Sequence, residues 1–196
     1  MVMKKIAIQG IQGSYHHKVA VNYFGENIEI FECLSFDDVA SSVISGKCEL
    51  GVMAIENSIA GSIIPNYSII DNSNLEIIGE YYFDINHQLL AYPGVEIKDL
   101  EFISSHPMAL LQCKDFLKKN PKITLIEARD TAKVAHEIKK NKIKNTGAIA
   151  SIEAAELYSL DIISKNIQSK KNNETRFVFV SKSKTQHNEE FNKASL

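Results

Sequence analysis

Two arginines stand out in the sequence, because the other twenty basic residues are all lysines. Arginine binds a carboxylate through two parallel hydrogen bonds, a task that lysine performs poorly. Arg176 follows Thr175 where an extended run, residues 175–182, begins after a polar turn. A guanidinium beside a hydroxyl at such a place favours recognition of a small carboxylated ligand. Arg129 lies just before the start of a predicted helix, and its neighbours indicate no particular role.

Three loops carry polar groups at places where a strand ends and a helix begins. They span residues 10–14, 56–61 and 105–112, and each combines glycine, hydroxyl or amide side chains with a helix start. Helix N-termini and glycine-rich turns present backbone N–H groups that bind anions. The same residue types are common in tight turns and helix caps, so each loop taken alone leaves both interpretations open.

The composition is that of a globular protein and excludes several other classes. The chain has 196 residues, a net charge of −2 and 44% apolar residues, which suits one domain or two small lobes. No run approaches the roughly 18 apolar residues of a membrane span, and the start lacks the pattern of a signal peptide. The charge indicates no nucleic-acid partner. We therefore expect a cytoplasmic protein with neither a membrane nor a nucleic-acid partner.

Metal and thiol chemistry are not indicated by any motif. The three cysteines have no CxxC spacing, which argues against a disulfide framework and against a zinc site. The sequence also has no HExxH motif and no acidic metal cluster. A cleft lined by amides, hydroxyls and helix N-termini remains, and such a cleft suits a small carboxylate.

Strand and helix patterns alternate along the whole chain. The expected strands are short runs rich in β-branched residues, at 5–9, 28–33, 49–55, 102–104, 123–127, 147–150 and 162–167. Alternation of this kind implies mostly parallel sheets with helices on both faces. Two extended runs, 76–92 and 175–182, interrupt it and are expected to cross between two lobes. Two of the expected helices are long, spanning residues 62–72 and 107–119.

The predicted fold class is therefore α/β, with two α/β lobes joined by two crossing strands. Lobe 1 is expected to hold residues 1–78 plus 176–184, and lobe 2 residues 79–175. Residues 185–196 are polar and are expected to form a tail. Ligands of such folds lie at the carboxyl ends of the strands, so the site is expected between the lobes.

Taken together, the loops resemble the motifs of the prephenate dehydratase family. Residues 10–20 read GIQGSYHHKVA, similar to that family's GPxGTFSHxAA, and residues 54–61 read AIENSIAG, similar to PIENSxxG. Residues 105–113 read SHPMALLQC, similar to SHPQALxQC, and residues 130–132 match the family's DTA. The closing NxTRF motif is intact as NETRF at residues 173–177, so the resemblance runs from about Ile6 to Val180.

The resemblance implies a fold like that of type-2 periplasmic binding proteins, a homodimer, and a reaction that needs neither cofactor nor metal. In that reaction prephenate, a dicarboxylate, loses CO2 and water and becomes phenylpyruvate on the route to phenylalanine. Thr175 is implied as the hydroxyl that hydrogen-bonds or protonates the leaving group. A donor role suits threonine better than that of a general acid, because its hydroxyl is a weak acid.

The resemblance also implies roles for other residues. Asn57, Ser58 and Gln112 are implied as further catalytic residues that orient the substrate. The residues implied in substrate binding are Gly13, Ser14, Glu56, Ser105, Thr131, Arg176 and Phe177. Arg176 and the 10–14 loop are expected to hold the two carboxylates, and Glu56 is expected to order its own loop or to touch the substrate.

The sequence departs from the family pattern at several positions. Ile11 replaces a proline, Ser14 a threonine, His16 a serine and Met108 a glutamine. Ser14 keeps a hydroxyl, whereas His16 brings a titratable ring near the expected anion site. Residues 192–196 resemble the start of the ACT regulatory domain that most family members carry, so feedback inhibition by phenylalanine is expected to be absent.

Two alternatives stand beside prephenate dehydratase. Arogenate dehydratase would use the same motifs on a substrate that carries an ammonium in place of the keto group, and no single residue discriminates between them. A non-catalytic, bilobed binding module for a small carboxylate would need the cleft but not the hydroxyl of Thr175.

Overall fold

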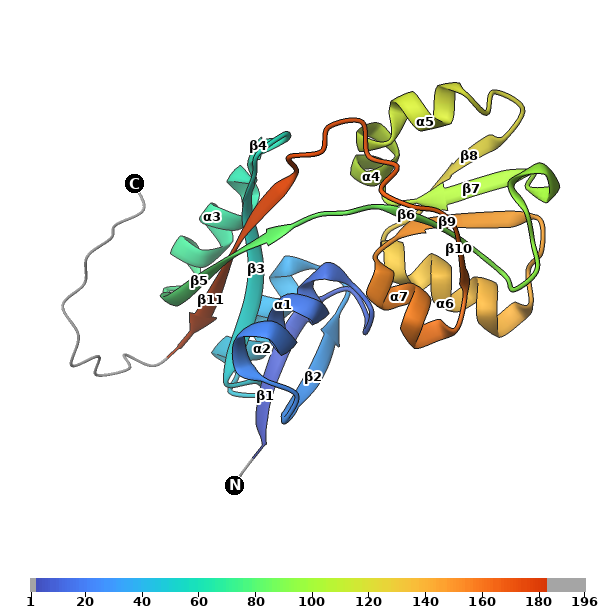
Figure 1. Cartoon of the computed structure of the whole chain (residues 1–196). Helices are drawn as coiled ribbons and strands as arrows, with labels where there is room; N and C mark the ends of the chain where they lie inside the picture. The colour runs from blue at the N-terminus through green and yellow to red at the C-terminus, as the bar shows by residue number, and fades with distance from the viewer. Residues whose placement is uncertain (1–2, 183–196) are drawn as a thin grey trace.

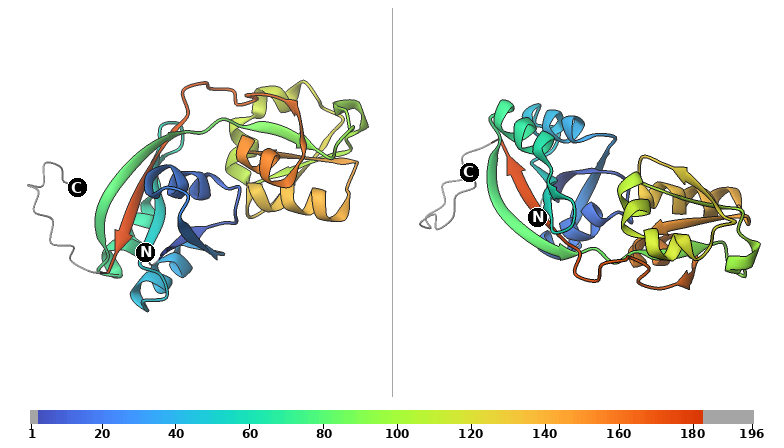
Figure 2. Two further views of the ribbon diagram at one scale, coloured as in Figure 1. Left: turned by 60° about the horizontal axis from the view of Figure 1, so that its bottom comes forward. Right: turned by 90° about the horizontal axis from the view of Figure 1, so that it is seen from above.

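The computed structural model describes residues 3–182 and contains two β-sheets, each covered by helices (Figure 1). The sheets lie at the two ends of an elongated molecule, and two chain segments connect them (Figure 2). The predicted class, two α/β lobes joined by two crossing strands, is confirmed. The residue boundaries of the lobes stay a prediction, and the expected tail lies outside the described residues.

The first sheet has the strand order β2-β1-β3-β11-β5. Its strands are β1 (Lys4–Gln9), β2 (Ile28–Cys33), β3 (Leu50–Asn57), β5 (Glu76–Asp84) and β11 (Glu174–Ser181), and the short β4 (Gly61–Ser62) pairs with β3. Side chains alternate between its two faces. One face packs against α2 (Phe36–Ile44) and α3 (Ile64–Asn72), and the other against α1 (Tyr15–Phe24).

The second sheet has the strand order β10-β6-β9-β7-β8. Its strands are β6 (Gln88–Ala91), β7 (Phe102–Ser105), β8 (Thr124–Glu127), β9 (Thr146–Ala150) and β10 (Asp161–Ser164). The short 3-10 helix η1 (Ile97–Asp99) precedes β7. The helices α4 (Pro107–Gln112) and α5 (Lys114–Lys118) cover one face, and α6 (Thr131–Asn141) and α7 (Ile152–Tyr158) the other.

The chain crosses between the sheets twice, and the two crossings lie side by side. Residues 85–87 lead from β5 to β6, and residues 165–173 lead from β10 back to β11. The Ile85 amide donates to the Asn173 carbonyl (2.7 Å), and the Ile167 amide donates to the His87 carbonyl (2.9 Å). These bonds tie the two crossing segments into a pair of strands that acts as the hinge between the lobes.

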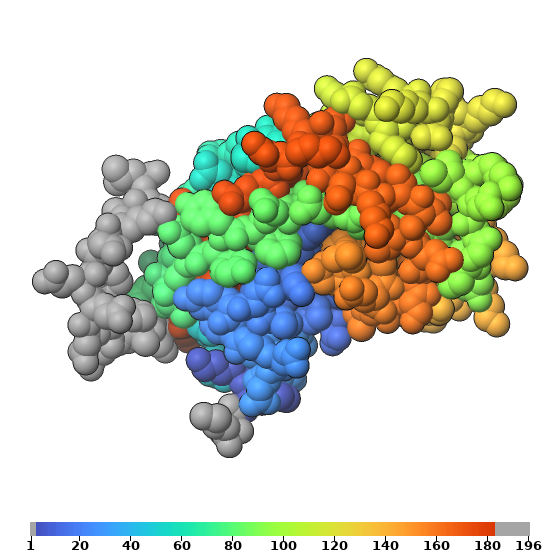
Figure 3. Space-filling model, in the orientation of Figure 1, coloured from blue at the N-terminus to red at the C-terminus, as the bar shows by residue number. Residues whose placement is uncertain are grey.

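A second contact between the lobes joins the loop after β1 to α7. The Ser151 hydroxyl, which also caps α7, donates to the Gly13 carbonyl (2.7 Å), and the Tyr158 hydroxyl donates to the Gln12 carbonyl (2.5 Å). Gly13 has a φ of +89°, and a Cβ there would approach the Cα of Ala154 to 3.2 Å. Figure 3 shows this contact as the place where blue and orange atoms meet. The close approach explains the glycine.

The elements differ from the sequence predictions in three places. Each sheet is only half parallel, because the strands next to the crossings run antiparallel to their neighbours. The helix expected over 107–119 is divided at Cys113, whose φ of −103° leaves the helical range. The helix expected over 62–72 begins at Ile64, because Gly61 and Ser62 pair with the end of β3.

Candidate active site

A cavity of about 410 Å³ lies between the lobes, beside the hinge. It is lined by β-strand ends and helix starts of both sheets, which is where a ligand of an α/β fold is expected. The first lobe contributes apolar side chains, the end of β3 and the start of β11, and the second lobe contributes the starts of α4 and α6. Six of the residues predicted for the site line it: Ser14, Asn57, Gln112, Thr131, Thr175 and Phe177.

Thr175 lies on the inner face of β11 with its hydroxyl fixed by one neighbour. Asn57 Nδ2 donates to Thr175 Oγ1 at 2.9 Å, and both side chains are buried. Asn57 is itself held, because its Oδ1 accepts from the amides of Ile59 (3.0 Å) and Ala60 (2.9 Å). Among the described residues no acceptor takes the Thr175 proton. The oxygen of Thr175 is therefore used as an acceptor, and its O–H is left to donate to a ligand.

Asn57 is one end of a buried chain of hydrogen bonds. Its Nδ2 also donates to Asn173 Oδ1 (2.7 Å), and Asn173 Nδ2 donates to Gln112 Oε1 (3.1 Å). The same Gln112 oxygen lies 2.8 Å from His87 Nε2, and His87 Nδ1 lies 2.9 Å from the Tyr15 hydroxyl. These bonds link β3 and α1 of the first lobe to α4 of the second through the hinge residues Asn173 and His87, so they fix the lobes as well as the side chains.

Which atom donates and which accepts in each of these hydrogen bonds follows from which atoms carry a proton. An amide oxygen only accepts, so His87 Nε2 carries the ring proton and donates it to Gln112. The Tyr15 hydroxyl lies 2.9 Å from His87 Nδ1 and 3.0 Å from the Asn86 carbonyl, and its one proton is shared between these two acceptors. Burial lowers the pKa of His87 below its ordinary value, which keeps the ring neutral and preserves this arrangement. The Gln112 amide nitrogen has no partner among the described residues and is available to a ligand in the cavity.

His16 lines the cavity next to Phe177. Its ring makes an edge contact with Phe177 (centroids 5.1 Å apart) and a tilted contact with Phe36 (5.4 Å). Burial lowers the pKa of His16 to about 4, so the ring is neutral at pH 7. Its Nε2 atom is buried and has no hydrogen-bond partner within residues 3–182.

Two charged residues line the cavity, and both come from the loop that opens α6. Asp130 accepts from the Lys133 amide at 2.6 Å and so caps α6, and burial raises the pKa of its carboxyl. The other Asp130 oxygen lies against Gly10, where a Cβ would collide with it. Arg129 is the single lysine or arginine among the described lining residues. It is exposed, and the described part of the chain gives it no ion pair.

Five residues predicted for the site lie outside the cavity lining, and the structure gives each another contact. Gly13 packs against α7, as described above. The Ser105 hydroxyl is buried and donates to the Ile149 carbonyl at 2.6 Å, which joins β7 to β9. Ser58 is exposed, and its backbone amide and its hydroxyl both bond the Glu174 backbone. That pairing fixes the loop after β3 on the hinge.

Arg176 and Glu56 lie on the face of the first sheet that points away from the cavity, which we call the outer face. Val178 and Val180 of β11 lie on the same face and pack against α2 and α3. Arg176 Nε donates to Glu80 Oε2 at 2.8 Å, and Glu56 Oε2 lies 4.0 Å from the Arg176 guanidinium. Successive side chains of a strand point to opposite faces, so Thr175 and Phe177 face the cavity while Arg176 faces away. The expected binding of a substrate carboxylate by Arg176 stays a prediction, and this geometry does not favour it.

Sequence reasoning missed several residues that the structure brings to the site. Asn173 lies inside the quoted NETRF motif, and its place two residues before Thr175 was a usable signal. Tyr15 lies inside the quoted motif at residues 10–20, at the start of α1, whereas His87 lies in the crossing run and nothing in its local sequence marks it. Arg129 was noticed as a rare arginine but had no context, because only the fold brings the β8–α6 loop to the cavity.

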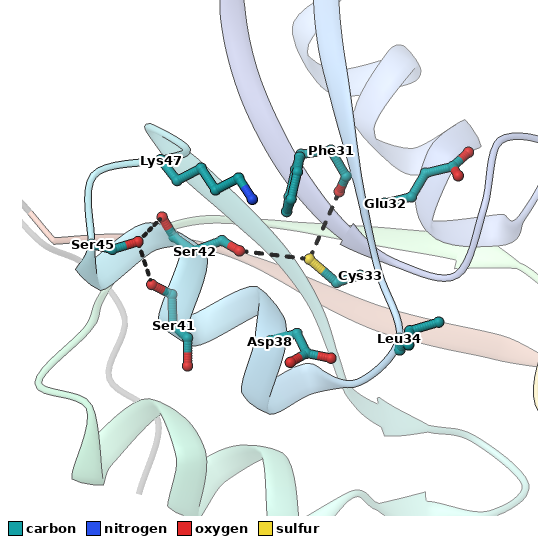
Figure 4. A pocket seen from close by; sticks show the side chains of 9 residues that line it. All are labelled: Phe31, Glu32, Cys33, Leu34, Asp38, Ser41, Ser42, Ser45 and Lys47. Atoms are coloured by element: carbon teal, nitrogen blue, oxygen red, sulfur yellow. Dashed lines mark hydrogen bonds between the residues drawn. The ribbon is translucent and has the colours of Figure 1, made fainter.

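A second hollow, of about 380 Å³, lies between β2 and α2 (Figure 4). Its thiol, Cys33, is buried, and Cys33 Sγ lies 3.8 Å from Ser42 Oγ. Burial raises the pKa of Cys33, so the thiol stays protonated and is a poor nucleophile. Within residues 3–182, no series of hydrogen-bonded side chains like the one at the hinge reaches this hollow. We assign no reaction to it.

The fold and cavity define a class of two-lobed α/β proteins that hold a small ligand at the hinge. The lipoprotein Tp32 of Treponema pallidum shares the fold alone, at 11% identity and a TM-score of 0.50, over 91% of this chain and 83% of that one. The likeness to periplasmic binding proteins expected from the sequence is thus confirmed at the level of the fold. In residues 3–182, none of the helices has the length and apolar character needed to cross a membrane.

Within this class, residues 6–185 match the prephenate dehydratase family, and the chain belongs to that family. Arogenate dehydratase/prephenate dehydratase 1 of Arabidopsis thaliana is 39% identical over 91% of this chain and 45% of its own length. The bifunctional chorismate mutase/prephenate dehydratase of Buchnera aphidicola is 34% identical over 93% of this chain and 48% of its own. The chain thus spans about half the length of these relatives.

A solved structure agrees with the sequence comparison. The prephenate dehydratase of Arthrobacter aurescens in complex with L-Phe has a TM-score of 0.81 and 25% identity to this chain. The two match over 90% of this chain and 60% of that one.

Proposed function

We propose that the chain converts prephenate into phenylpyruvate by decarboxylative dehydration, as a step toward phenylalanine. The observation that carries the proposal is the Thr175 hydroxyl, whose oxygen is held by Asn57 Nδ2 and whose proton is free to donate. A protein that only bound a carboxylate would not need a donor fixed in this way. The family match and the cavity between the lobes support the same reaction.

The reaction requires few chemical groups from the protein. The bond between ring carbon 1 and its carboxylate breaks and releases CO2, and that electron pair enters the ring. The 4-hydroxyl leaves with its own bonding pair and takes up one proton, so that it departs as water. Aromatisation of the ring drives the step. The protein therefore needs to position the ring, stabilise the departing oxygen and keep water away.

Thr175 supplies the hydrogen bond to the departing oxygen. A threonine hydroxyl is a weak acid, so it acts as a fixed donor and relay, and the proton comes ultimately from solvent. The Gln112 amide is a second donor within the same cavity. The buried chain from Asn57 to Tyr15 holds both donors in place before the substrate arrives, which avoids reorganisation during the reaction.

The first-lobe wall of the cavity is apolar. Ala54, Ile63, Ile85 and Phe177 line it and belong to the core that packs on α1. Such a wall accepts the substrate ring and excludes water from it. Loss of CO2 spreads the charge of a carboxylate, so a poorly hydrated site favours that loss.

Further parts of the proposal concern the whole protein. We propose a carbon–oxygen lyase that acts in the cytoplasm as a homodimer. In line with the family motifs, Asn57 and Gln112 orient the substrate beside Thr175. Ser14 and Thr131 bind the substrate from the starts of α1 and α6.

The test is an assay of the purified chain with prephenate and, separately, with arogenate. Phenylpyruvate and phenylalanine are quantified at pH 8, where prephenate is stable enough for a blank without protein to be subtracted. We expect phenylpyruvate from prephenate, and Thr175→Ala is expected to abolish most of it. Phenylalanine from arogenate alone would reassign the substrate. Binding of phenylpyruvate without turnover of either substrate would make the chain a binding module and overturn the proposal.

A further inference from the structure

Arg129 is positioned to bind a negatively charged group of a ligand. It lines the cavity of about 410 Å³ and also an adjoining hollow of about 750 Å³. The two share Gln9, Phe36, His106 and Arg129, so Arg129 stands where the cavity opens into the wider space between the lobes. Its guanidinium has no ion pair among the described residues. Arg176, by contrast, is held by Glu80 on the outer face.

The substrate of the proposed reaction carries two carboxylates with different fates. The ring carboxylate leaves as CO2, and its charge disperses as the bond breaks. An arginine paired with it would stabilise the bound substrate more than the transition state and would slow the reaction. The side-chain carboxylate keeps its charge throughout and remains in the product. An arginine paired with that group strengthens binding without affecting the chemical step.

The two ends of the substrate also match the positions of the two key residues. The 4-hydroxyl lies at one end of the ring, and carbon 1, which bears the side chain, lies at the other. Thr175 comes from β11 of the first sheet, and Arg129 comes from the loop between β8 and α6 of the second. Both residues line the same cavity of about 410 Å³, so one substrate that spans the lobes has Thr175 on one side and Arg129 on the other.

We propose that Arg129 binds the side-chain carboxylate that the product retains, and that the ring carboxylate has no lysine or arginine partner within residues 3–182. The inference rests on the proposed function, because it assumes a substrate of this kind. It makes Arg129 a binding residue of the second lobe. The same carboxylate is present in arogenate, so the assignment holds for either substrate.

The experiment measures binding and turnover separately for Arg129→Gln. Phenylpyruvate carries the retained carboxylate and lacks the one that leaves, so its affinity, measured by isothermal titration calorimetry, reports the proposed pair alone. We expect the affinity to fall about 10- to 100-fold, the usual cost of losing a charge-assisted pair to a ligand. KM for prephenate is expected to rise by a similar factor, with kcat changed less than about threefold.

Two further variants sharpen the result. Arg129→Lys keeps the charge but not the paired hydrogen bonds, and it is expected to recover part of the affinity. Lys133→Gln removes one positive charge on α6 from an exposed side chain that does not line the cavity, and it is expected to leave phenylpyruvate affinity unchanged. A loss in both Gln variants would indicate a general effect of charge and would overturn the assignment.

The outcomes separate this inference from the proposed function. If wild-type protein converts prephenate and Arg129→Gln binds phenylpyruvate as tightly as wild type, the function stands and the role of Arg129 is wrong. If Arg129→Gln lowers kcat and leaves KM intact, the arginine acts on the departing group and the inference is also wrong. If wild type binds phenylpyruvate through Arg129 but converts neither substrate, the function fails while the binding assignment stands.

Discussion

The two faces of strand β11 carry different kinds of chemistry, although they share one short motif. The inner face presents Thr175 and Phe177 to the cavity, both nearly fully buried. The outer face presents Arg176 to two glutamates on the neighbouring strands β3 and β5. Strand alternation makes this division unavoidable, since residue 176 cannot face the same way as residues 175 and 177. Adjacency in a motif therefore does not mean a shared role.

The inner face depends on a donor that is fixed before the substrate binds. The Thr175 oxygen accepts from Asn57, and four further side chains continue the hydrogen-bonded chain to Tyr15. On the outer face the Arg176 guanidinium pairs with Glu80, and the two side chains are 13% and 29% exposed. Changes on the inner face should therefore affect catalysis, and changes on the outer face should affect stability.

The largest effect is expected from Thr175→Ala. Removing the donor is expected to lower kcat by about 10²- to 10⁴-fold, the usual range for one group that assists proton transfer or stabilises developing charge. KM should change little, because the hydroxyl acts mainly in the transition state. Steady-state kinetics with prephenate checks the result. Thr175→Ser, which keeps the hydroxyl, should stay within about tenfold of wild type, and equal losses in both variants would argue against the donor role.

The next effect is on stability and comes from His16, a titratable ring of α1 that packs against Phe177 of the inner face. Burial lowers the pKa of His16 to about 4, against 6.5 for an ordinary histidine. Between these values the unfolded chain binds more protons than the folded chain, so the free energy of unfolding falls as the pH falls from 6.5 toward 4. The full loss is about 3 kcal/mol for a shift of this size.

Urea titrations of wild type and His16→Ser at pH 7.5 and pH 4.5 measure this loss. Serine is the residue that the family motif carries at this position, so the variant is expected to fold. We expect wild type to lose more stability than the variant on acidification, by about 2 to 3 kcal/mol. Parallel losses in the two proteins would show that His16 does not titrate in this window.

Asn57→Asp tests how the donor is oriented. The new carboxylate can accept hydrogen bonds but cannot donate, so the Thr175 proton is expected to turn toward residue 57 and away from the substrate. We expect kcat to fall about 10- to 100-fold, less than in Thr175→Ala, because the hydroxyl remains in the site. The bonds from the Ile59 and Ala60 amides should survive, whereas those to Asn173 Oδ1 and to the Glu174 carbonyl are lost. A kcat equal to that of wild type would mean that Asn57 does not set the direction of the hydroxyl.

Much of the fold could be predicted from the sequence, because strand and helix periods are local properties. The β-branched run at 28–33 and the polar turn before Thr175 needed no tertiary information, and they were placed correctly. The antiparallel half of each sheet could not be predicted, because the direction of a strand depends on which strands the crossing segments join. That pairing is a long-range property of the chain.

The candidate site was predictable where its residues lie in motifs and unpredictable where the fold alone brings them together. Thr175, Asn57 and Gln112 are far apart in sequence, but each lies in a recognisable loop. His87 and Arg129 lie in segments with no motif, and only the hinge and the α6 loop bring them to the cavity. Arg176 shows the opposite case, since its motif indicates a site and its side chain faces the other way.

The smallest effect is expected on the outer face, from Arg176→Gln. The change removes the 2.8 Å bond to Glu80 and is expected to lower the free energy of unfolding by about 1 kcal/mol, the usual net contribution of one such bond. For a chain of this size that is a fall in Tm of about 2 to 4 °C. Thermal unfolding checks the stability, and KM for prephenate checks the alternative that Arg176 binds a substrate carboxylate. A large rise in KM with an unchanged Tm would show that Arg176 turns inward when substrate binds, and the division between the two faces would then hold only for the empty cavity.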